Sequence, residues 1–319
     1  MTHLFTVIGE ALIDLVAACG DSTFVAHAGG SPANVALGLA RLGCPVTLTT
    51  RLGEDAFGRM LIDHLESSGV VVDGGAKPWG STSLAVATLM DGVASYDFRI
   101  DWDVERLSSV AVGARCLRTG SLATALAPGN AAVVDLVRRE RESGRVTVSY
   151  DPNVRPALLG EPARARPGIE SMVALSHVVK VSDEDLGWLY PGERDKDVAR
   201  RWLSTGPAMV VVTRGDKGAF AVTRSLEVQR PAVLVELVDT VGAGDSFTSG
   251  LLDGLRRTDL IGGQRHDALA AVDETTLGSI LDEATLIAAI TCSRPGADPP
   301  ASAEVDAART ARRPLSGSR

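Results

Sequence analysis

The sequence has few of the residues that build metal clusters, disulfide scaffolds or nucleic-acid surfaces. Its 319 residues include four cysteines, and no two of them form a Cys-x-x-Cys pair. Scattered cysteines are typical of reduced thiols rather than of a zinc site or a disulfide framework. The formal net charge is −8, and no basic run occurs before the C-terminal tail. We therefore expect neither nucleic acid nor an anionic membrane as a partner.

Three other patterns are also missing. No apolar run is long enough to span a bilayer, and the N-terminal residues lack the charged and apolar regions of a signal peptide. We therefore expect a cytoplasmic protein. There is no Gly-x-x-x-x-Gly-Lys-Ser/Thr loop, and no Gly-x-Gly-x-x-Gly follows the first predicted strand. The second absence argues against a dinucleotide-dependent dehydrogenase.

What the sequence does contain is an alternation of strand and helix patterns from end to end. Short β-branched runs at residues 5–9, 46–52 and 209–213 are separated by longer helical patterns. Hydrophobic residues make up 45% of the chain, enough for a sizeable core. This alternation predicts an α/β fold in which helices cover both faces of a mostly parallel sheet.

The stretch 239–247 reads Asp-Thr-Val-Gly-Ala-Gly-Asp-Ser-Phe. A β-rich apolar run at 233–238 leads into it and a helical pattern at 246–256 follows, so we expect a strand-to-helix turn. The N–H groups of Gly242, Ala243 and Gly244 would bind an anion at the helix N-terminus. Asp245 then has two interpretations. It is a base that takes a proton from a hydroxyl during phosphoryl transfer, or it only caps the helix.

A second stretch, 29–36, reads Gly-Gly-Ser-Pro-Ala-Asn-Val-Ala. It predicts a helix with Ser31 as N-cap and a proline at the first helical position. Gly29 and Gly30 would let the backbone approach a ligand closely. The Asn34 side chain offers both a donor and an acceptor, which suits a polyol. Alternatively, the glycines form only a turn and Asn34 caps the helix.

Together these stretches resemble the C-terminal and N-terminal signatures of the ribokinase-like (PfkB) carbohydrate kinases. The signatures are in the right order, about two hundred residues apart, and the resemblance covers residues 4–308. It implies a three-layer αβα sandwich with a small β-sheet lid, whose strands come from about 11–27 and 81–101. We expect one domain over residues 1–308 and a disordered tail over 309–319.

The resemblance implies a sugar site beneath the lid. Asp14 matches an aspartate that hydrogen-bonds sugar hydroxyls, although pattern alone favours a solvent-facing strand residue. Gly29, Gly30 and Asn34 would contact the same sugar. Two β-patterned runs joined by Asp91-Gly92 predict a hairpin of the lid. On this hairpin, Tyr96, Phe98 and Arg99 could cover the sugar. The alternative for Tyr96 and Phe98 is that they pack between the lids of a homodimer.

Residues 151–156 read Asp-Pro-Asn-Val-Arg-Pro and follow another strand pattern. They resemble the fructokinase and 2-keto-3-deoxygluconate kinase branches of the family. Arg155 would contact a phosphate or an acidic substrate, or else form an ion pair with Asp151.

Two further motifs resemble the family's nucleotide site. Ser182-x-x-Asp185 stands where many relatives have Asn-x-x-Glu, which implies that Asp185 organises Mg²⁺ through water. Thr213-x-Gly215-x-x-Gly218 resembles the turn that touches ATP phosphate and ribose. Gly242 and Gly244 belong to the same nucleotide site. The implied cofactors are ATP, Mg²⁺ and a monovalent cation such as K⁺.

The predicted function is transfer of the ATP γ-phosphate to the primary hydroxyl of a sugar, with Asp245 as base. D-fructose is the leading substrate. The alternatives are 2-keto-3-deoxygluconate, whose carboxylate would use Arg99 and Arg155, and another sugar of the family. A non-catalytic sugar-sensing relative is a further alternative, against which the intact Gly-Ala-Gly-Asp argues.

Overall fold

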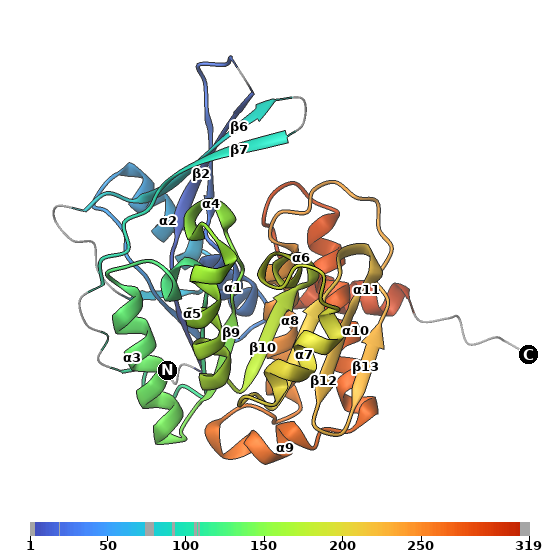
Figure 1. Ribbon diagram of the computed structural model, residues 1–319. Coiled ribbons are helices and arrows are strands. Elements are labelled where there is room, and N and C mark those ends of the chain that lie inside the picture. The colour runs from blue at the N-terminus through green and yellow to red at the C-terminus, as the bar shows by residue number, and fades with distance from the viewer. Residues whose placement is uncertain are drawn as a thin grey trace, which may run out of the picture.

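A nine-stranded sheet forms the centre of the molecule (Figure 1). The computed structural model describes residues 4–18, 20–73, 80–90, 93–104, 107 and 109–312. In spatial order the strands are β13 (Glu227–Arg230), β12 (Ala219–Thr223), β11 (Met209–Thr213), β10 (Val178–Ser182), β9 (Thr147–Asp151), β8 (Cys116–Gly120), β1 (Phe5–Ile8), β4 (Val46–Thr49) and β5 (Val71–Asp73). Neighbours from β11 to β5 run parallel, whereas β12 and β13 are antiparallel. The predicted mostly parallel sheet is confirmed.

Helices cover both faces of this sheet and enclose two hydrophobic cores. On one face lie α1 (Ser31–Arg41), α2 (Ala56–Glu66), α8 (Ala243–Arg257) and α10 (Glu274–Cys292). On the other lie α3 (Asn130–Ser143), α5 (Pro162–Leu175), α6 (Asp183–Leu189) and α7 (Asp195–Leu203). Strands buried on both faces need continuous apolar runs, and four consecutive residues of β11, from Met209 to Val212, are 0% exposed. The remaining short helices are α4 (Pro156–Leu159), α9 (His266–Ala270), α11 (Ser302–Ala311), η1 (Ser121–Thr124), η2 (Gly215–Lys217) and η3 (Gly263–Arg265).

A second, four-stranded sheet projects from one end of the body (Figure 1). Its order is β3 (Val25–Gly29), β2 (Leu12–Ala18), β6 (Ser83–Met90) and β7 (Val93–Arg99). Ile13 from one face of this sheet is fully buried in the main core, so that face is anchored to the body. β6 and β7 pair antiparallel, as a hairpin requires. Asp91 and Gly92, which predicted the turn between them, lie outside the described residues.

Helix α10 is long and apolar enough, by length and composition, to cross a membrane. It instead packs as a core helix against α8, with 56% of its apolar window buried. Gly250 and Gly254 of α8 allow this close contact. A side chain at either position would start only 2.9 Å from an isoleucine of α10.

The apolar run at 233–238 does not form the strand that its composition predicts. Leu234 is 94% exposed and Leu237 is 64% exposed. Pro231 directly follows the edge strand β13 and has no N–H group to continue the ladder. Farther along, the N–H groups of Val238 and Asp239 both donate to the Cys292 carbonyl oxygen. The segment is therefore an extended loop that leads to the α8 N-terminus.

The C-terminal region also differs from expectation. A disordered tail was expected from residue 309, yet α11 spans Ser302–Ala311 and Val305 is buried against Leu286 and Ile287. Residues 309–311 of the predicted tail are helical, and 313–319 lie outside the described residues. Apolar contact of Val305 and Ala308 with α10 accounts for the helix, because tertiary packing supplies most of the stability of short helices.

Candidate active site

The loops that follow β1, β8, β9, β10 and β11 meet at one edge of the main sheet. These five strands are parallel, so their carboxyl ends lie together, and open α/β sheets bind ligands at this edge. The N-termini of α1 and α8 reach the same region, since Ser31 of α1 touches Asp245 of α8. The candidate site is built from these ends.

The Asp245 carboxylate is held by two donors from α1. Ser31 Oγ donates to its Oδ1 at 2.6 Å, and Asn34 Nδ2 donates to its Oδ2 at 2.9 Å. The residue lies in the first turn of α8, where Gly242 is the N-cap and no side chain caps the helix. The capping interpretation of Asp245 is therefore wrong. Burial raises its pKa, while the two donors favour the ionised form.

This clamp also revises the roles expected of two α1 residues. Ser31 is the first residue of α1 rather than its N-cap, which is Gly30, and its hydroxyl binds Asp245. The amide nitrogen of Asn34 serves Asp245 too, so only its carbonyl oxygen is left for another ligand. Both residues orient the candidate base, a role that sequence reasoning did not assign to either.

The turn before Asp245 has the geometry of the predicted anion site, except that one of the three predicted amide donors is already hydrogen-bonded. Gly242 adopts a left-handed φ of 76°, which turns the chain into α8. The N–H of Ala243 donates to the Thr240 carbonyl oxygen at 3.2 Å, so it is already engaged. First-turn amides have no partner within their own helix, and the N–H groups of Gly242 and Gly244 remain the candidate anion donors.

A buried lysine to which sequence reasoning assigned no role lies against this turn. Lys180 of β10 is 5% exposed, and its Nζ would be 3.1 Å from a Cβ placed on Gly244. Its ammonium contacts Asp151 Oδ2 at 3.1 Å. The signal that could have revealed it is a charged residue within an otherwise apolar strand pattern. Lys180 adds positive charge where the α8 N-terminus already favours an anion.

The other predicted nucleotide residues line the adjacent strand ends. Ser182 and Thr213 are paired in register at the ends of β10 and β11. Ser182 caps α6 by accepting the Asp185 N–H at 3.0 Å. Gly215 and Gly218 flank the η2 turn with left-handed φ values of 53° and 86°. The structure thus brings the predicted ATP-binding segments side by side.

Asp185 is the predicted organiser of Mg²⁺. Its Oδ1 accepts the Val154 N–H at 3.0 Å, which ties it to the loop after β9. Burial and the neighbouring Asp151 carboxylate raise its pKa to about 6. Within the described ranges no cluster of three or more His, Cys, Asp or Glu side chains is placed to hold a metal ion. The Asp185 carboxylate nevertheless suits a cation held largely by phosphate and water.

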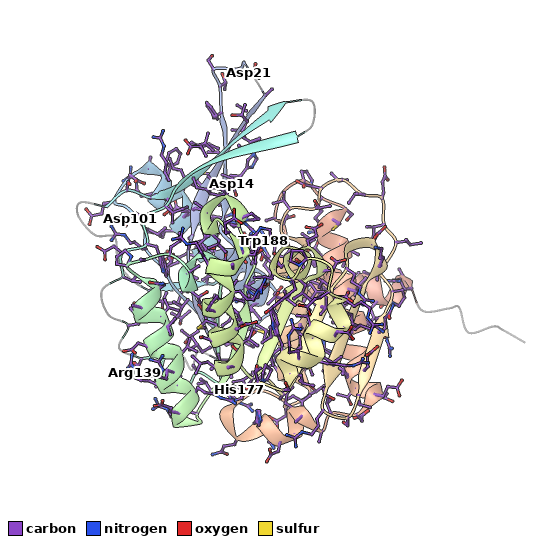
Figure 2. The ribbon with its side chains drawn as sticks, in the orientation of Figure 1. Asp14, Asp21, Asp101, Arg139, His177 and Trp188 are labelled. Carbon is purple, nitrogen blue, oxygen red and sulfur yellow. The ribbon has the colours of Figure 1, made fainter. Side chains whose placement is uncertain are left out.

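Asp14 lies at the base of the small sheet (Figure 2). A Cβ on Gly29 would be 2.2 Å from Asp14 Oδ2, so the glycine leaves room for the carboxylate. A Cβ on Gly30 would be 2.6 Å from the Glu10 carbonyl oxygen, and Gly30 has a φ of 101°. Burial raises the pKa of Asp14 to about 6, partly opposed by His27 and Arg155.

The strand register separates the three lid residues. Phe98 pairs with Ala85, which pairs with Asp14, so Phe98 and Asp14 share a face. Arg99 is one residue further and pairs with Leu84, on the opposite face. The expectation that Arg99 joins Asp14 over the sugar therefore does not match the register. Tyr96 lies in β7 opposite Ala87.

Arg155 does not form the ion pair with Asp151 that its spacing allowed. Its Nη1 donates to the Asn153 side-chain oxygen at 2.8 Å and to the Val154 carbonyl oxygen at 3.1 Å. Its charge lowers the pKa values of both Glu10 and Asp14, so it lies near these two carboxyl groups. Asp151 is paired instead with Lys180.

Glu10 is a second residue that sequence reasoning missed. It lies two residues after the end of β1, is 3% exposed, and its Oε2 has no hydrogen-bond partner within the described structure. Burial raises its pKa to about 7, while the Ser121 hydroxyl and Arg155 lower it. Ser121 holds a left-handed φ of 52°, a conformation that stores strain at functional sites.

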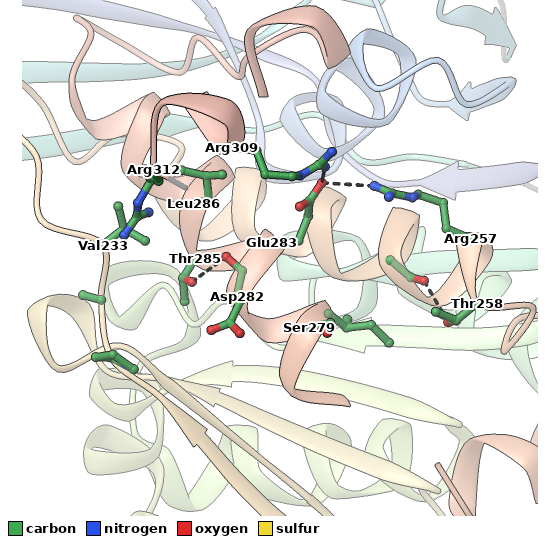
Figure 3. A pocket seen from close by; sticks show the side chains of 14 residues that line it. Val233, Arg257, Thr258, Ser279, Asp282, Glu283, Thr285, Leu286, Arg309 and Arg312 are labelled. Atoms are coloured by element: carbon green, nitrogen blue, oxygen red, sulfur yellow. Dashed lines mark hydrogen bonds and ion pairs between the residues drawn. The ribbon is translucent and has the colours of Figure 1, made fainter. Parts of the chain in front are cut away.

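A cavity of about 710 Å³ lies elsewhere, between α8, α10 and α11 (Figure 3). None of the candidate site residues lines it. Its arginines Arg257 and Arg309 are both paired with Glu283. This cavity is therefore separate from the site built around Asp245.

Glu10→Gln is expected to raise the thermal stability at pH 8. The folded-state pKa near 7 exceeds the ordinary 4.5, so folding favours the protonated acid. The contribution of Glu10 to the free energy of unfolding is therefore fully present below pH 4.5. It is lost as the pH rises to about 7, by an amount on the order of 1–3 kcal/mol. Glutamine does not ionise, so the variant should not lose stability as the pH rises. The measurement is Tm at pH 5 and pH 8, with exposed Glu142→Gln as control, and an equal Tm difference at both pH values would contradict it.

Comparison with known proteins identifies the family. Residues 2–304 match the family described as pfkB family carbohydrate kinase. A fructokinase from Rhizobium leguminosarum bv. trifolii is 33% identical over 277 residues, which cover 84% of each chain. The crystal structure of a fructokinase from Xylella fastidiosa with bound ATP has a TM-score of 0.87 at 28% identity, covering 98% of this chain and 100% of that one.

A double mutant of the fructokinase from Vibrio cholerae, solved with fructose, ADP and potassium ion, has a TM-score of 0.78 at 26% identity. The match covers 96% of this chain and 98% of that one. These findings confirm the resemblance carried by the two signatures. Since the match extends over nearly the whole sequence, this chain belongs to the pfkB family of carbohydrate kinases and is an ATP-dependent sugar kinase.

Proposed function

We propose that this kinase phosphorylates D-fructose at a primary hydroxyl and that Asp245 is the catalytic base. The observation that carries the proposal is the Asp245 carboxylate, held by Ser31 and Asn34 at the start of α8. Fructokinases from bacteria and plants are 33% and 34% identical to this chain. The Vibrio cholerae structure contains fructose itself.

In the proposed reaction the sugar lies below the small sheet, between Asp14, Gly30 and Arg155. Asp14 accepts a hydrogen bond from a sugar hydroxyl, and Phe98 covers the same face. Asp245 takes the proton of the attacking hydroxyl, whose oxygen forms a bond to the γ-phosphorus as the bond to ADP breaks.

The nucleotide lies along the ends of β10 and β11. Its γ-phosphate faces Lys180 and the amides of Gly242 and Gly244, which stabilise charge on the transferring group. Asp185 would hold Mg²⁺ through water, and the ion supplies further charge neutralisation when bound. The proposal includes K⁺, because the Asp239 carboxylate lies at the loop before α8 and accepts the Gly296 N–H. It also includes a cytoplasmic location, because Cys44 and Cys116 are buried free thiols.

A second candidate substrate is 2-keto-3-deoxygluconate. Arg155 favours it, because its guanidinium lies near Glu10 and Asp14 in the proposed sugar site and makes no ion pair among the described residues. Arg99 gives no support, because it lies on the other face of the small sheet.

Asp245→Asn is expected to lower kcat by roughly 10²–10⁴ because the amide cannot accept the hydroxyl proton. The KM for Mg·ATP should change little, since nucleotide binding does not require the base. Steady-state assays of ADP production give both constants. Asp306→Asn, an exposed aspartate of α11, is the control. Near-normal turnover of Asp245→Asn would remove Asp245 from the mechanism.

Fructose is expected to give the highest kcat/KM in a panel with 2-keto-3-deoxygluconate, ribose, fructose 6-phosphate and adenosine. The readout is ADP production with Mg·ATP present. Turnover with the ketodeoxy acid alone would reject fructose and place Arg155 at the substrate carboxylate. Silence across the panel, with ATP still bound, would reject fructose as acceptor while leaving the nucleotide site intact.

We also propose a homodimer that forms through the small sheets. Phe24 is 44% exposed and Val25 is 56% exposed, at the free edge of this sheet. Light scattering should give a mass near twice the 33.3 kDa of the chain. Val25→Lys should shift it to the monomer, whereas Val112→Lys, at an exposed valine outside the sheet, should not. A monomeric wild-type protein at micromolar concentration would overturn the proposal.

A further inference from the structure

Arg118 is a fully buried arginine to which the proposed reaction gives no role. It lies in β8 between β1 and β9, and its side chain is 0% exposed. Its Nη1 donates to the Thr119 carbonyl oxygen, but Nε and Nη2 have no hydrogen-bond partner within the described structure. A buried guanidinium with unsatisfied N–H groups is strongly unfavourable, so its position calls for a compensating role.

One buried carboxylate forms ion pairs with both this arginine and Lys180. Asp151 is 1% exposed, and its Oδ2 is 3.1 Å from Lys180 Nζ and 3.6 Å from Arg118 Nη2. Its other oxygen accepts the Asn153 N–H at 3.1 Å. Two cations therefore share one carboxylate, and Asp185, whose pKa is raised by Asp151 and lowered by Lys180, is the other acid beside them.

The Lys180 side of this group lies beside the proposed phosphoryl site. Lys180 Nζ would be 3.1 Å from a Cβ on Gly244, in the first turn of α8. The helix N-terminus adds positive potential at the same place. At the opposite side of the group, a Cβ on Gly120 would be 2.8 Å from Arg118 Nη1 and 2.0 Å from the Asp151 carbonyl oxygen. Glycine at this position lets the arginine and Asp151 pack together.

We propose that Arg118 is a positioning residue for phosphoryl transfer: it balances the Asp151 carboxylate and so frees the Lys180 ammonium for the γ-phosphate. The inference rests on the proposed function, because that function places the γ-phosphate at Gly244. It assigns Arg118 a part in the reaction although it touches no substrate.

The physical reason is charge balance in a buried place. If Arg118 were neutral, Lys180 and Asp151 would form a closed pair with no net charge. An ammonium that turned toward the phosphate would then leave a buried carboxylate without a counter-ion, which is strongly unfavourable. With Arg118 only 3.6 Å from the same oxygen, Asp151 stays paired when Lys180 turns.

The test compares Arg118→Met, which removes the charge, with Arg118→Lys, which keeps it. We expect Arg118→Met to lower kcat and the affinity for a non-hydrolysable ATP analogue by about 10- to 100-fold, as for a lost charged contact. Its affinity for ADP should stay within about threefold. Arg118→Lys should stay within about threefold of the wild type in all three constants. Arg138→Met, at an exposed arginine of α3, is the matched control.

Three results would overturn the proposal. The first is an unchanged kcat in folded Arg118→Met, which would leave Arg118 a structural counter-ion that affects only Tm. The second is an equal loss of ADP and analogue affinity. The third, for use if Arg118→Met does not fold, is a ¹⁵N ammonium signal of Lys180 in the wild type that does not shift when the analogue binds.

Failure of the proposed acceptor can be distinguished from failure of this inference. If the wild type does not phosphorylate fructose, the comparison of analogue and ADP binding still reports on Arg118. If fructose is phosphorylated and Arg118→Met behaves as the wild type, the proposed function stands and the positioning role does not.

Discussion

The pair of hydrogen bonds from Ser31 and Asn34 to Asp245 is the contact on which the site depends. It joins segments more than two hundred residues apart and fixes the start of α8 against the start of α1. Both helices pack on the same face of the main sheet, so the carboxylate is held between rigid elements. As the proposed base, Asp245 needs little reorganisation when the substrate arrives, which is how preorganised sites lower a barrier.

Charge at this edge of the sheet is arranged at the expense of stability. Glu10, Asp14 and Asp185 all have raised pKa values, chiefly because burial disfavours their charged forms. The protein thus keeps several buried carboxyl groups at positions where an apolar side chain would make the folded state more stable. Natural proteins accept such losses mainly where binding or catalysis requires the polar group.

The sequence allowed the fold and the segments of the site to be predicted, because local patterns encode strands, helices and glycine turns. The bond between Ser31 and Asp245 was out of reach, since no local pattern relates residues 214 positions apart. The face of Arg99 depends on the pairing of β7 with β6, which a one-residue slip would reverse. The run at 233–238 looked like a strand because apolar content does not reveal that Pro231 ends the ladder. Lys180 and Arg118 were missed because they sit inside strands that otherwise look like core.

The connection between the small sheet and α1 has a mechanical consequence. β3 ends at Gly29 and α1 begins at Ser31, so a single residue separates the small sheet from the helix that holds Asp245. That residue, Gly30, packs its backbone against Glu10 and leaves no slack in the chain. A movement of the small sheet would therefore be transmitted directly to Ser31 and through it to the Asp245 carboxylate. Under the proposed function, enclosure of the sugar and alignment of the base would be a single event.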